Sequence, residues 1–162
     1  MFKKKMKIFL EYKPPKDIRT LFIVHYAPLI LIILTGPITP LYGIWKISEE
    51  LFSIIIGIII FLLGSYVYFK WEIFWQKTYH GQLVTDGIFK KIRHPHYTSL
   101  LIIGFGLAFF FNSLFALIVA VISIPIMIIS ILDEEKRLIK QYGEDYKKYK
   151  KETPWRIIPK LF

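Results

Sequence analysis

The sequence has no cysteine, which excludes disulfide bonds, thiolate metal ligands and thiol nucleophiles. Charged residues are also absent from four long apolar stretches, at 21–41, 51–69, 98–111 and 114–132. An α-helix rises ~1.5 Å per residue, so about 20 apolar residues cross the ~30 Å hydrocarbon layer of a bilayer. The third stretch is short unless its helix begins before Tyr97. We predict an all-α polytopic membrane protein with about four transmembrane helices and a cytoplasmic C-terminal helix, forming a single domain over 1–162.

The connections between these stretches differ in length. Asn112-Ser113 is the polar break between the third and fourth stretches, which predicts a tight helical hairpin. Three longer polar segments are a basic arm at 1–18, a loop at 70–97 and a tail at 133–162. The arm has no apolar core followed by a small-residue cleavage site, so we expect an interfacial or disordered arm rather than a secretory signal.

The basic residues indicate an orientation. Of the 22 Lys and Arg residues, 20 lie in the three long polar segments, and Arg19 directly follows the arm. The remaining one, Lys46, lies between the first and second apolar stretches. Cytoplasmic segments of membrane proteins carry such an excess. We therefore predict an integral protein of the cytoplasmic membrane with both termini, the loop and the tail on the cytoplasmic side. This distribution explains the net charge of +10 without a nucleic-acid partner.

The most specific sequence lies in the loop, which ends GQLVTDGIFKKIRHPHY, and in the tail, which begins DEEKRLIKQYGEDYKKYKKETPWRIIP. This ordered pair resembles the isoprenylcysteine carboxyl methyltransferase family and its phospholipid methyltransferase relatives. The family pattern runs LVT-x-G-x-[YF], RHPxYxG, an apolar hairpin, EExxL, [FY]GxxYxxY and R-x-x-P. The matching positions are Leu83-Val84-Thr85, Gly87, Phe89, Arg93-His94-Pro95, Tyr97, Glu134-Glu135, Leu138, Tyr142-Gly143, Tyr146, Tyr149, Arg156 and Pro159. The resemblance covers 83–159, with Ser99 in place of the glycine after RHPxYx.

The resemblance implies methyl transfer from S-adenosylmethionine to a lipophilic acceptor, a carboxylate or an amine, at the cytoplasmic interface. It implies that the cofactor site is lined by Leu83, Val84, Arg93, His94, Tyr97, Glu134 and Glu135, and that Arg93, Glu134 and Glu135 act in catalysis. Membrane lipid is the expected surrounding. A membrane reductase, since sterol reductases share a related C-terminal module, and a non-catalytic binding protein of the same fold are the alternatives. Neither the acceptor nor the oligomeric state is apparent from the sequence.

These residue types suit that cofactor. The Arg93 guanidinium is a planar fork that matches a carboxylate, and His94 can donate to the same group. Pro95 is suited to the first turn of a helix, whose amide groups and dipole would also favour an anion. Glu134 and Glu135 can hold an ammonium or ribose hydroxyls, but neighbouring helical residues point about 100° apart. We expect only one of the two to face the ligand squarely.

Each of these features also has a structural interpretation. Arg93 with its neighbouring lysines is typical of a membrane anchor, and the glutamates can pair with nearby lysines. Tyr142, Tyr146 and Tyr149 form a stripe on the helical face that also carries Glu135, and such tyrosines are common at membrane interfaces. His94 and His96 are too isolated for a zinc site, so no metal is predicted. His25 is expected to bond a neighbouring helix, and Gly104 and Gly106 fit helix packing or a groove for an apolar tail.

Overall fold

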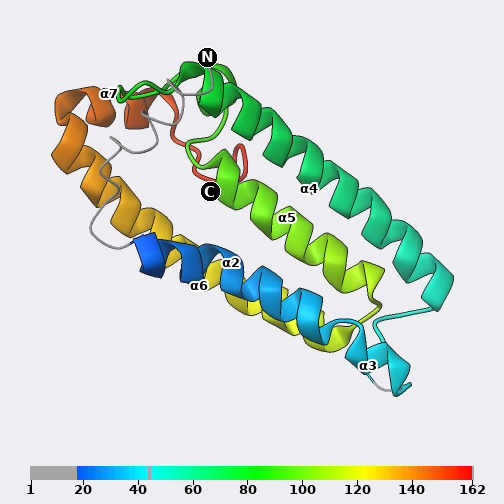
Figure 1. Ribbon diagram of the computed structural model, residues 1–162. Helices are drawn as coiled ribbons and strands as arrows, with labels where there is room; N and C mark the ends of the chain where they lie inside the picture. Colours follow the sequence, from blue (N-terminus) through cyan, green and yellow to red (C-terminus); the bar gives the residue numbers. More distant parts are fainter. Residues whose placement is uncertain (1–17, 44, 162) are drawn as a thin grey trace, which may run out of the picture.

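The centre of the fold is an antiparallel pair of helices, α4 (Glu50–Thr78) and α5 (Pro95–Phe110), which lie side by side in Figure 1. This computed structural model describes residues 18–43 and 45–161. Gly57 and Gly64 on α4 face α5, and Gly106 on α5 faces α4, which lets the two backbones approach closely. The Ser53 hydroxyl donates to the Phe109 carbonyl at 2.7 Å across the same interface.

Two further helices pack against this pair. Helix α2 (Ile18–Thr35) lies along α6 (Leu114–Tyr142) and also contacts α5. Small side chains make this approach possible, because buried Ile32 of α2 meets three buried alanines: Ala108, Ala116 and Ala120. Helices α4 and α6 are each long and apolar enough to cross a membrane, whereas α5 and the stretch His25–Thr35 are shorter apolar helices.

One end of the bundle is closed by short connections. The four-residue helix α3 (Ile38–Leu41) follows α2 there. Asn112 turns the chain from α5 to α6, and its side chain accepts from the amides of Ile47 and Ser48 at 3.1 and 3.2 Å. Ser113 then caps α6 by accepting from the Ala116 amide at 3.2 Å. The predicted tight hairpin at Asn112-Ser113 is therefore confirmed.

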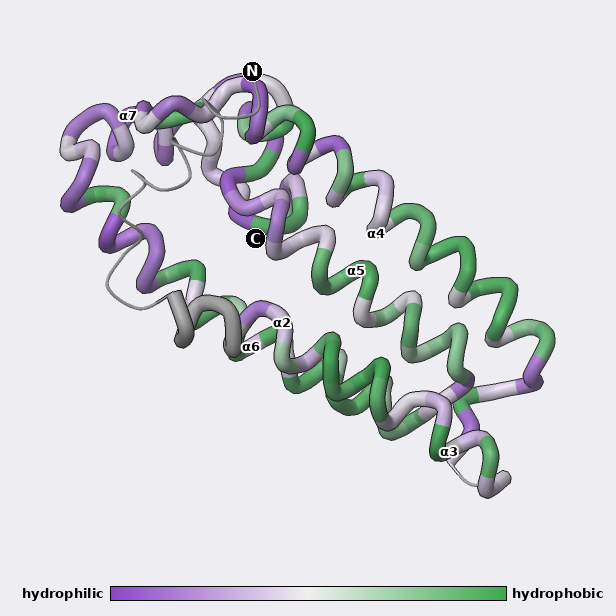
Figure 2. The backbone as a smooth tube through the Cα atoms, viewed as in Figure 1, coloured by the Kyte–Doolittle hydropathy of each residue, from purple (hydrophilic) through white to green (hydrophobic). Residues whose placement is uncertain are grey.

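The opposite end carries the polar residues. It holds the 3₁₀ turn η1 (Gly87–Lys90), the short helix α7 (Glu144–Glu152) and the C-terminal segment 153–161. Figure 2 shows the hydropathy changing along the bundle, with apolar helices over most of its length and hydrophilic residues gathered at the α7 end. A site for a charged, water-soluble molecule is therefore expected at this end.

The all-α prediction is confirmed for the described residues, and the helix bounds need correction. The predicted loop 70–97 begins inside α4, and the predicted tail 133–162 begins inside α6. Helix α4 continues because it has no Gly or Pro after Gly64, and its aromatic residues Trp71, Phe74 and Trp75 pack on Phe89 and its neighbours. Helix α6 continues to Tyr142 because it buries Glu135 on its inner face.

The other predicted bounds have mixed outcomes. The first apolar stretch, 21–41, is not one helix, since α2 ends at Thr35 and α3 is separate. The third helix begins at Pro95, before Tyr97, as its proline predicted. A short helix does follow in the tail, after a break at Gly143 with φ of 58°. The basic arm lies at 1–18, of which residues 1–17 are outside the described residues, and the single-domain assignment over 1–162 stays a prediction.

Candidate active site

Three parts of the chain meet at the polar end of the bundle. Arg93 and His94 come just before α5, whose first residue is Pro95. Glu134 and Glu135 lie in the last third of α6, beyond its apolar part. The segment after α7, residues 153–157, runs back along the start of α5. The RHP and EE motifs, about 40 residues apart in the sequence, are thus brought into contact.

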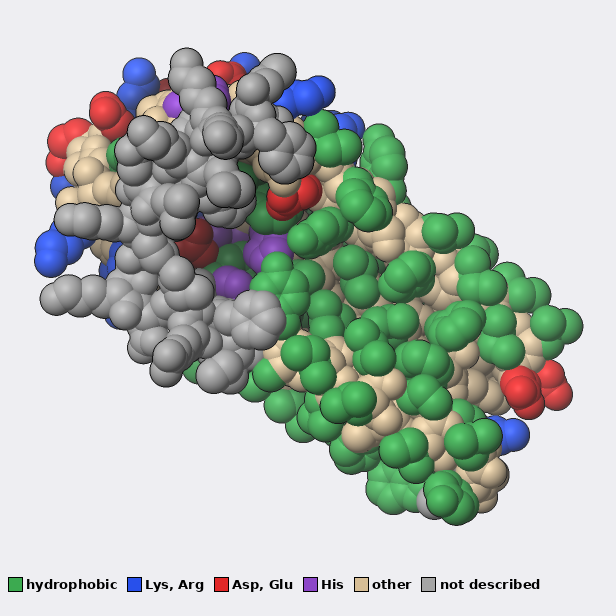
Figure 3. All heavy atoms as spheres, in the orientation of Figure 1, with side chains coloured by type: hydrophobic (Ala, Val, Ile, Leu, Met, Phe, Trp, Pro, Cys, Tyr) green, Lys and Arg blue, Asp and Glu red, His purple; other side chains and the backbone are tan. Residues whose placement is uncertain are grey.

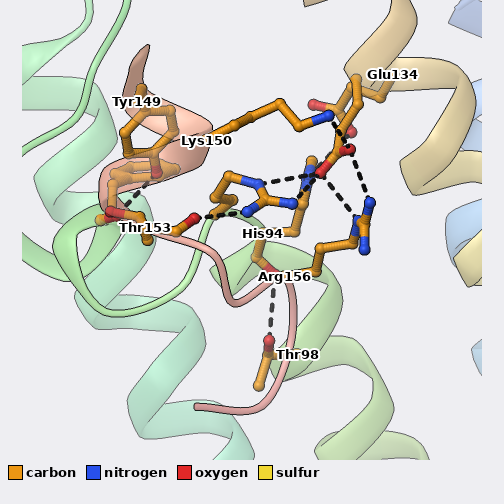
Figure 4. A network of polar contacts seen from close by, with 10 residues as sticks. His94, Thr98, Glu134, Tyr149, Lys150, Thr153 and Arg156 are labelled. Carbon is orange, nitrogen blue, oxygen red and sulfur yellow. Dashed lines mark hydrogen bonds and ion pairs between the residues drawn. The ribbon is translucent and has the colours of Figure 1, made fainter. Parts of the chain in front are cut away.

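Glu135 is the centre of this arrangement, since four basic side chains lie around its carboxylate. Figure 4 shows three of them, His94, Lys150 and Arg156, pointing toward the same place. Its side chain is only 4% exposed. Arg93 donates to Glu135 Oε1 from Nε at 3.0 Å and from Nη2 at 2.6 Å. Arg156 donates to Oε1 from Nε at 3.1 Å and to Oε2 from Nη2 at 3.2 Å. Lys150 Nζ lies 3.3 Å from Oε2, and His94 Nε2 lies 3.4 Å from Oε1.

This surrounding keeps Glu135 ionised. Burial by itself would raise the pKa of the Glu135 carboxyl, but its interactions with His94, Arg93 and Arg156 outweigh burial and leave the pKa well below its usual value. A buried carboxylate is stable only when it is paired and hydrogen-bonded in this way. Glu135 therefore acts as a fixed negative charge that holds four basic side chains around it: Arg93, His94, Lys150 and Arg156.

The C-terminal segment is fastened to the start of α5 by its backbone. The Arg93 amide donates to the Trp155 carbonyl and the His94 amide to the Arg156 carbonyl, both at 2.9 Å. The Thr98 hydroxyl donates to the Ile157 carbonyl at 2.9 Å. Arg93 Nη1 also donates to the Thr153 carbonyl at 2.5 Å. The amides of Arg93 and His94, which precede α5, are therefore occupied by protein carbonyls. The expectation that the amides of the first turn of α5 favour an anion stays a prediction.

Glu134 has different surroundings from its neighbour. Its side chain is 37% exposed, and Oε2 lies 3.7 Å from His94 Nδ1. It also lies beside the Tyr97 hydroxyl, which in turn is 2.6 Å from His25 Nε2. The two glutamates thus differ in exposure and in partners, and which of them faces the ligand stays a prediction. The bond between His25 of α2 and Tyr97 of α5 confirms the predicted interhelical role of His25.

Leu83 and Val84 lie in an apolar cluster next to this network. Val84 is buried with Phe89, Tyr146 and Tyr149, and Leu83 packs against them. The Tyr149 hydroxyl donates to the Phe89 carbonyl at 2.8 Å, which ties α7 to η1. Burial raises the pKa of the Tyr149 hydroxyl; the nearby Arg93 charge lowers this pKa, and the Glu135 charge raises it. The wall beside the Arg93–Glu135 pair is thus formed by Leu83, Val84, Tyr146 and Tyr149.

Most residues of this site were predicted from the sequence, and some were not. The structure brings together Arg93, His94, Tyr97, Glu134 and Glu135. Arg156, Lys150 and the Thr153 carbonyl were not named as site residues. Arg156 carried a signal, since it matches the last motif of the resemblance. No sequence pattern indicates Lys150 or Thr153, because their contacts depend on how α7 and the segment after it pack against the bundle.

These features define a class: an all-α protein with long apolar helices and a charged site where those helices end. The phospholipid methyltransferase family matches residues 51–145, which include both the RHP and the EE motifs. The chain therefore belongs to the phospholipid methyltransferase family, and the resemblance seen in the sequence is confirmed.

A comparison with curated proteins gives a second similarity. The chain is 34% identical over 91 residues to a Delta(14)-sterol reductase of Methylotuvimicrobium alcaliphilum (strain DSM 19304 / NCIMB 14124 / VKM B-2133 / 20Z). The match covers 53% of this chain and 21% of the reductase, so the chain spans about a fifth of the length of that relative. No solved structure matches the chain significantly.

Proposed function

We propose that this protein transfers a methyl group from S-adenosylmethionine to a lipophilic acceptor at the membrane interface. The observation that carries the proposal is the meeting of the RHP and EE motifs at the polar end of apolar helices, in a chain of the phospholipid methyltransferase family. The cofactor is charged and water-soluble, whereas the acceptor is dissolved in lipid. Both can reach a site at this boundary.

The side chains of the site differ in how available they are to bind the cofactor. Arg93 is buried, and its guanidinium is taken by Glu135 and the Thr153 carbonyl, so we assign it and Glu135 to positioning. Glu134 is the more exposed carboxylate and suits the cofactor's ammonium or ribose hydroxyls. Arg156, with a side chain 24% exposed, suits the cofactor's carboxylate. His94 and Tyr97 lie near Glu134, and we propose that they line the same site and that the backbone of Leu83 and Val84 contacts the adenine.

The chemistry requires little of the protein. S-adenosylmethionine supplies an electrophilic methyl group with an excellent leaving group already in place. The residues of the site therefore need to bind, orient and exclude water, and effective molarities for well-oriented groups are large enough to provide most of the acceleration. A rigid network around Glu135 suits this task, because methyl transfer requires the acceptor atom, the methyl carbon and the sulfur to be held in line.

We expect Glu134→Gln to weaken the binding of S-adenosylhomocysteine by ten- to a hundredfold, because a charged hydrogen bond in a partly buried site contributes roughly 1.5–3 kcal/mol. Calorimetry on detergent-solubilised protein measures this directly. Glu144→Gln, which changes a carboxylate on the exposed face of α7, is the matched control and should bind as the wild type does. Absence of binding to the wild-type protein would refute the proposal.

Reduction of a lipophilic double bond is the second candidate, and the similarity to a sterol reductase favours it. A reductase needs a hydride donor, and nicotinamide cofactors supply one. The same calorimetric experiment with a reduced nicotinamide cofactor separates the two candidates. Binding of the nicotinamide cofactor without binding of S-adenosylhomocysteine would select the reductase.

The membrane arrangement belongs to the same proposal. We propose that α2, α4, α5 and α6 all cross the bilayer, with both termini and the polar end in the cytoplasm. Helices α2 and α5 have 18 and 16 residues, which correspond to roughly 27 and 24 Å, slightly less than the hydrocarbon thickness. Local thinning of the bilayer accommodates such a difference at modest cost. The lipophilic acceptor would then enter sideways from the bilayer.

Single cysteines test this arrangement cleanly, because the chain has none of its own. We expect an impermeant thiol reagent to label Glu49→Cys in intact cells and to leave Lys77→Cys and Lys148→Cys unlabelled. All three positions are exposed in the structure, so burial does not explain a difference. Permeabilised cells, in which all three should react, are the control. Labelling of Lys77→Cys in intact cells would reverse the proposed orientation.

A further inference from the structure

A second cluster of polar and aromatic rings lies next to the candidate cofactor site. His96 is at its centre, and its ring centroid is 4.3 Å from that of Trp71 and 5.7 Å from that of His25. The rings of Tyr26, Tyr68 and Tyr97 surround it at 5.9–6.0 Å. We call this set the histidine cluster: His25, Tyr26, Tyr68, Trp71, His96 and Tyr97. It combines residues of α2, α4 and α5, whereas the family match begins after α2.

His96 has an unused hydrogen-bonding atom in this cluster. Its Nδ1 is buried and has no hydrogen-bond partner among the described residues. A buried polar atom without a partner costs free energy, so its presence calls for an explanation. In the tautomer with hydrogen on Nε2, the Nδ1 atom carries a lone pair and can accept a proton. His25 differs, because its Nε2 is already bonded to the Tyr97 hydroxyl.

The histidine cluster is placed between the cofactor site and the apolar helices. Tyr97 belongs to it and also lies beside Glu134. Tyr97 packs at the same time with Leu100, Met127 and Ile131, which continue the core into the apolar part of the bundle. Figure 3 shows histidine and acidic side chains in a recess where the polar end meets the hydrophobic surface. An acceptor whose tail lies among the apolar helices would place its polar head at this level.

We propose that the histidine cluster holds the head group of the methyl acceptor and that His96 removes its proton. This rests on the proposed function. The head group is one that donates a hydrogen bond, an amine or a hydroxyl, rather than a carboxylate. Glu134 beside Tyr97 disfavours a second negative charge there, and nearby Arg137 is already paired with Asp133 at 2.6 Å.

In this step the head group loses a proton to His96 Nδ1, from the N–H of its protonated amine or from the O–H of its hydroxyl. The lone pair freed in this way forms the new bond to the methyl carbon. The bond from that carbon to sulfur breaks, and its electron pair stays on sulfur, which gives the neutral thioether. The imidazolium of His96 then releases its proton to water. A carboxylate acceptor has no proton to lose at neutral pH and would not need His96.

The test compares acceptors in wild-type protein and in His96→Phe, which keeps an aromatic ring and removes both nitrogens. The acceptors are a short-chain aminophospholipid, a long-chain phenol and a farnesylated cysteine analogue, each with labelled S-adenosylmethionine. We expect the wild type to methylate the amine or the phenol, and the variant to lose at least tenfold in that rate, with partial recovery on adding free imidazole. S-adenosylhomocysteine should bind the variant as tightly as the wild type. His80→Phe, which changes an exposed histidine, is the matched control.

A second measurement does not depend on turnover. In calorimetry without cofactor, the aminophospholipid or the phenol should bind the wild type more tightly than it binds His96→Phe. Methylation of the farnesylated carboxylate alone would overturn this inference and leave the proposed function intact. An equal loss for all three acceptors in the variant, with cofactor binding retained, would also overturn it. Failure of the wild type to bind S-adenosylhomocysteine would instead refute the proposed function itself, together with this inference.

Discussion

Replacing Glu135 by alanine should destabilise the protein by about 3–5 kcal/mol, because it leaves buried Arg93 without its carboxylate. Arg156 and Lys150 lose their ion pairs with Glu135 at the same time. The effect should be largest in the C-terminal segment, since Arg93 connects Glu135 to the Thr153 carbonyl. Thermal unfolding in detergent measures the overall loss, and hydrogen exchange of residues 153–157 measures the local one.

The neighbouring residue provides a matched control for this experiment. Glu134→Ala removes the same side chain one position earlier on α6, where it is 37% exposed. We expect it to cost less than about 1 kcal/mol of stability, because exposed carboxylates contribute little. It should nevertheless weaken cofactor binding, whereas Glu135→Ala should reduce stability first. Equal destabilisation by the two substitutions would contradict the central role that we assign to Glu135.

Replacing Gly106 by alanine should also destabilise the protein, by about 1–3 kcal/mol or more. A Cβ atom at Gly106 would lie 2.5 Å from the amide nitrogen of Phe61 and 2.7 Å from its Cα atom. Both are backbone atoms of α4, so the two helices have to move apart. Separation of α4 and α5 removes the close contact that organises the bundle. The midpoint of thermal unfolding in detergent is the measurement.

Gly104 lies two residues earlier on α5 and provides the comparison. A Cβ atom there would meet the side chains of Leu29 and Ile32 at 3.5 and 3.6 Å, which is ordinary van der Waals contact. Alanine also favours helix over glycine by about 1 kcal/mol. Gly104→Ala should therefore be neutral or slightly stabilising. A loss at Gly104 as large as that at Gly106 would mean that the helix contact is not the cause. Of the two interpretations from the sequence, packing rather than a groove accounts for Gly106.

The arrangement around Glu135 changes how the motif residues are understood. From the sequence, Arg93, Glu134 and Glu135 were predicted to line the cofactor site, with one of the two glutamates facing the ligand squarely. In the structure, Arg93 and Glu135 face each other, and Glu134 with His94 and Tyr97 remains on the more exposed side. A spacing in the sequence can bring two charged residues to one site, but it does not distinguish a residue that contacts a ligand from one that holds another residue in place.

The sequence by itself determined the class of fold and the end of the bundle at which the charged motifs gather. Long apolar stretches without charges predict helices, and Pro95 predicts the start of α5, because these properties depend on local chemistry. Only the tertiary structure decided which charges pair, that the C-terminal segment occupies the amides before α5, and that His25 meets Tyr97 and His96. Those contacts join residues 15 to 72 positions apart in the chain. They depend on how four helices pack, which the periodicity of a single segment does not encode.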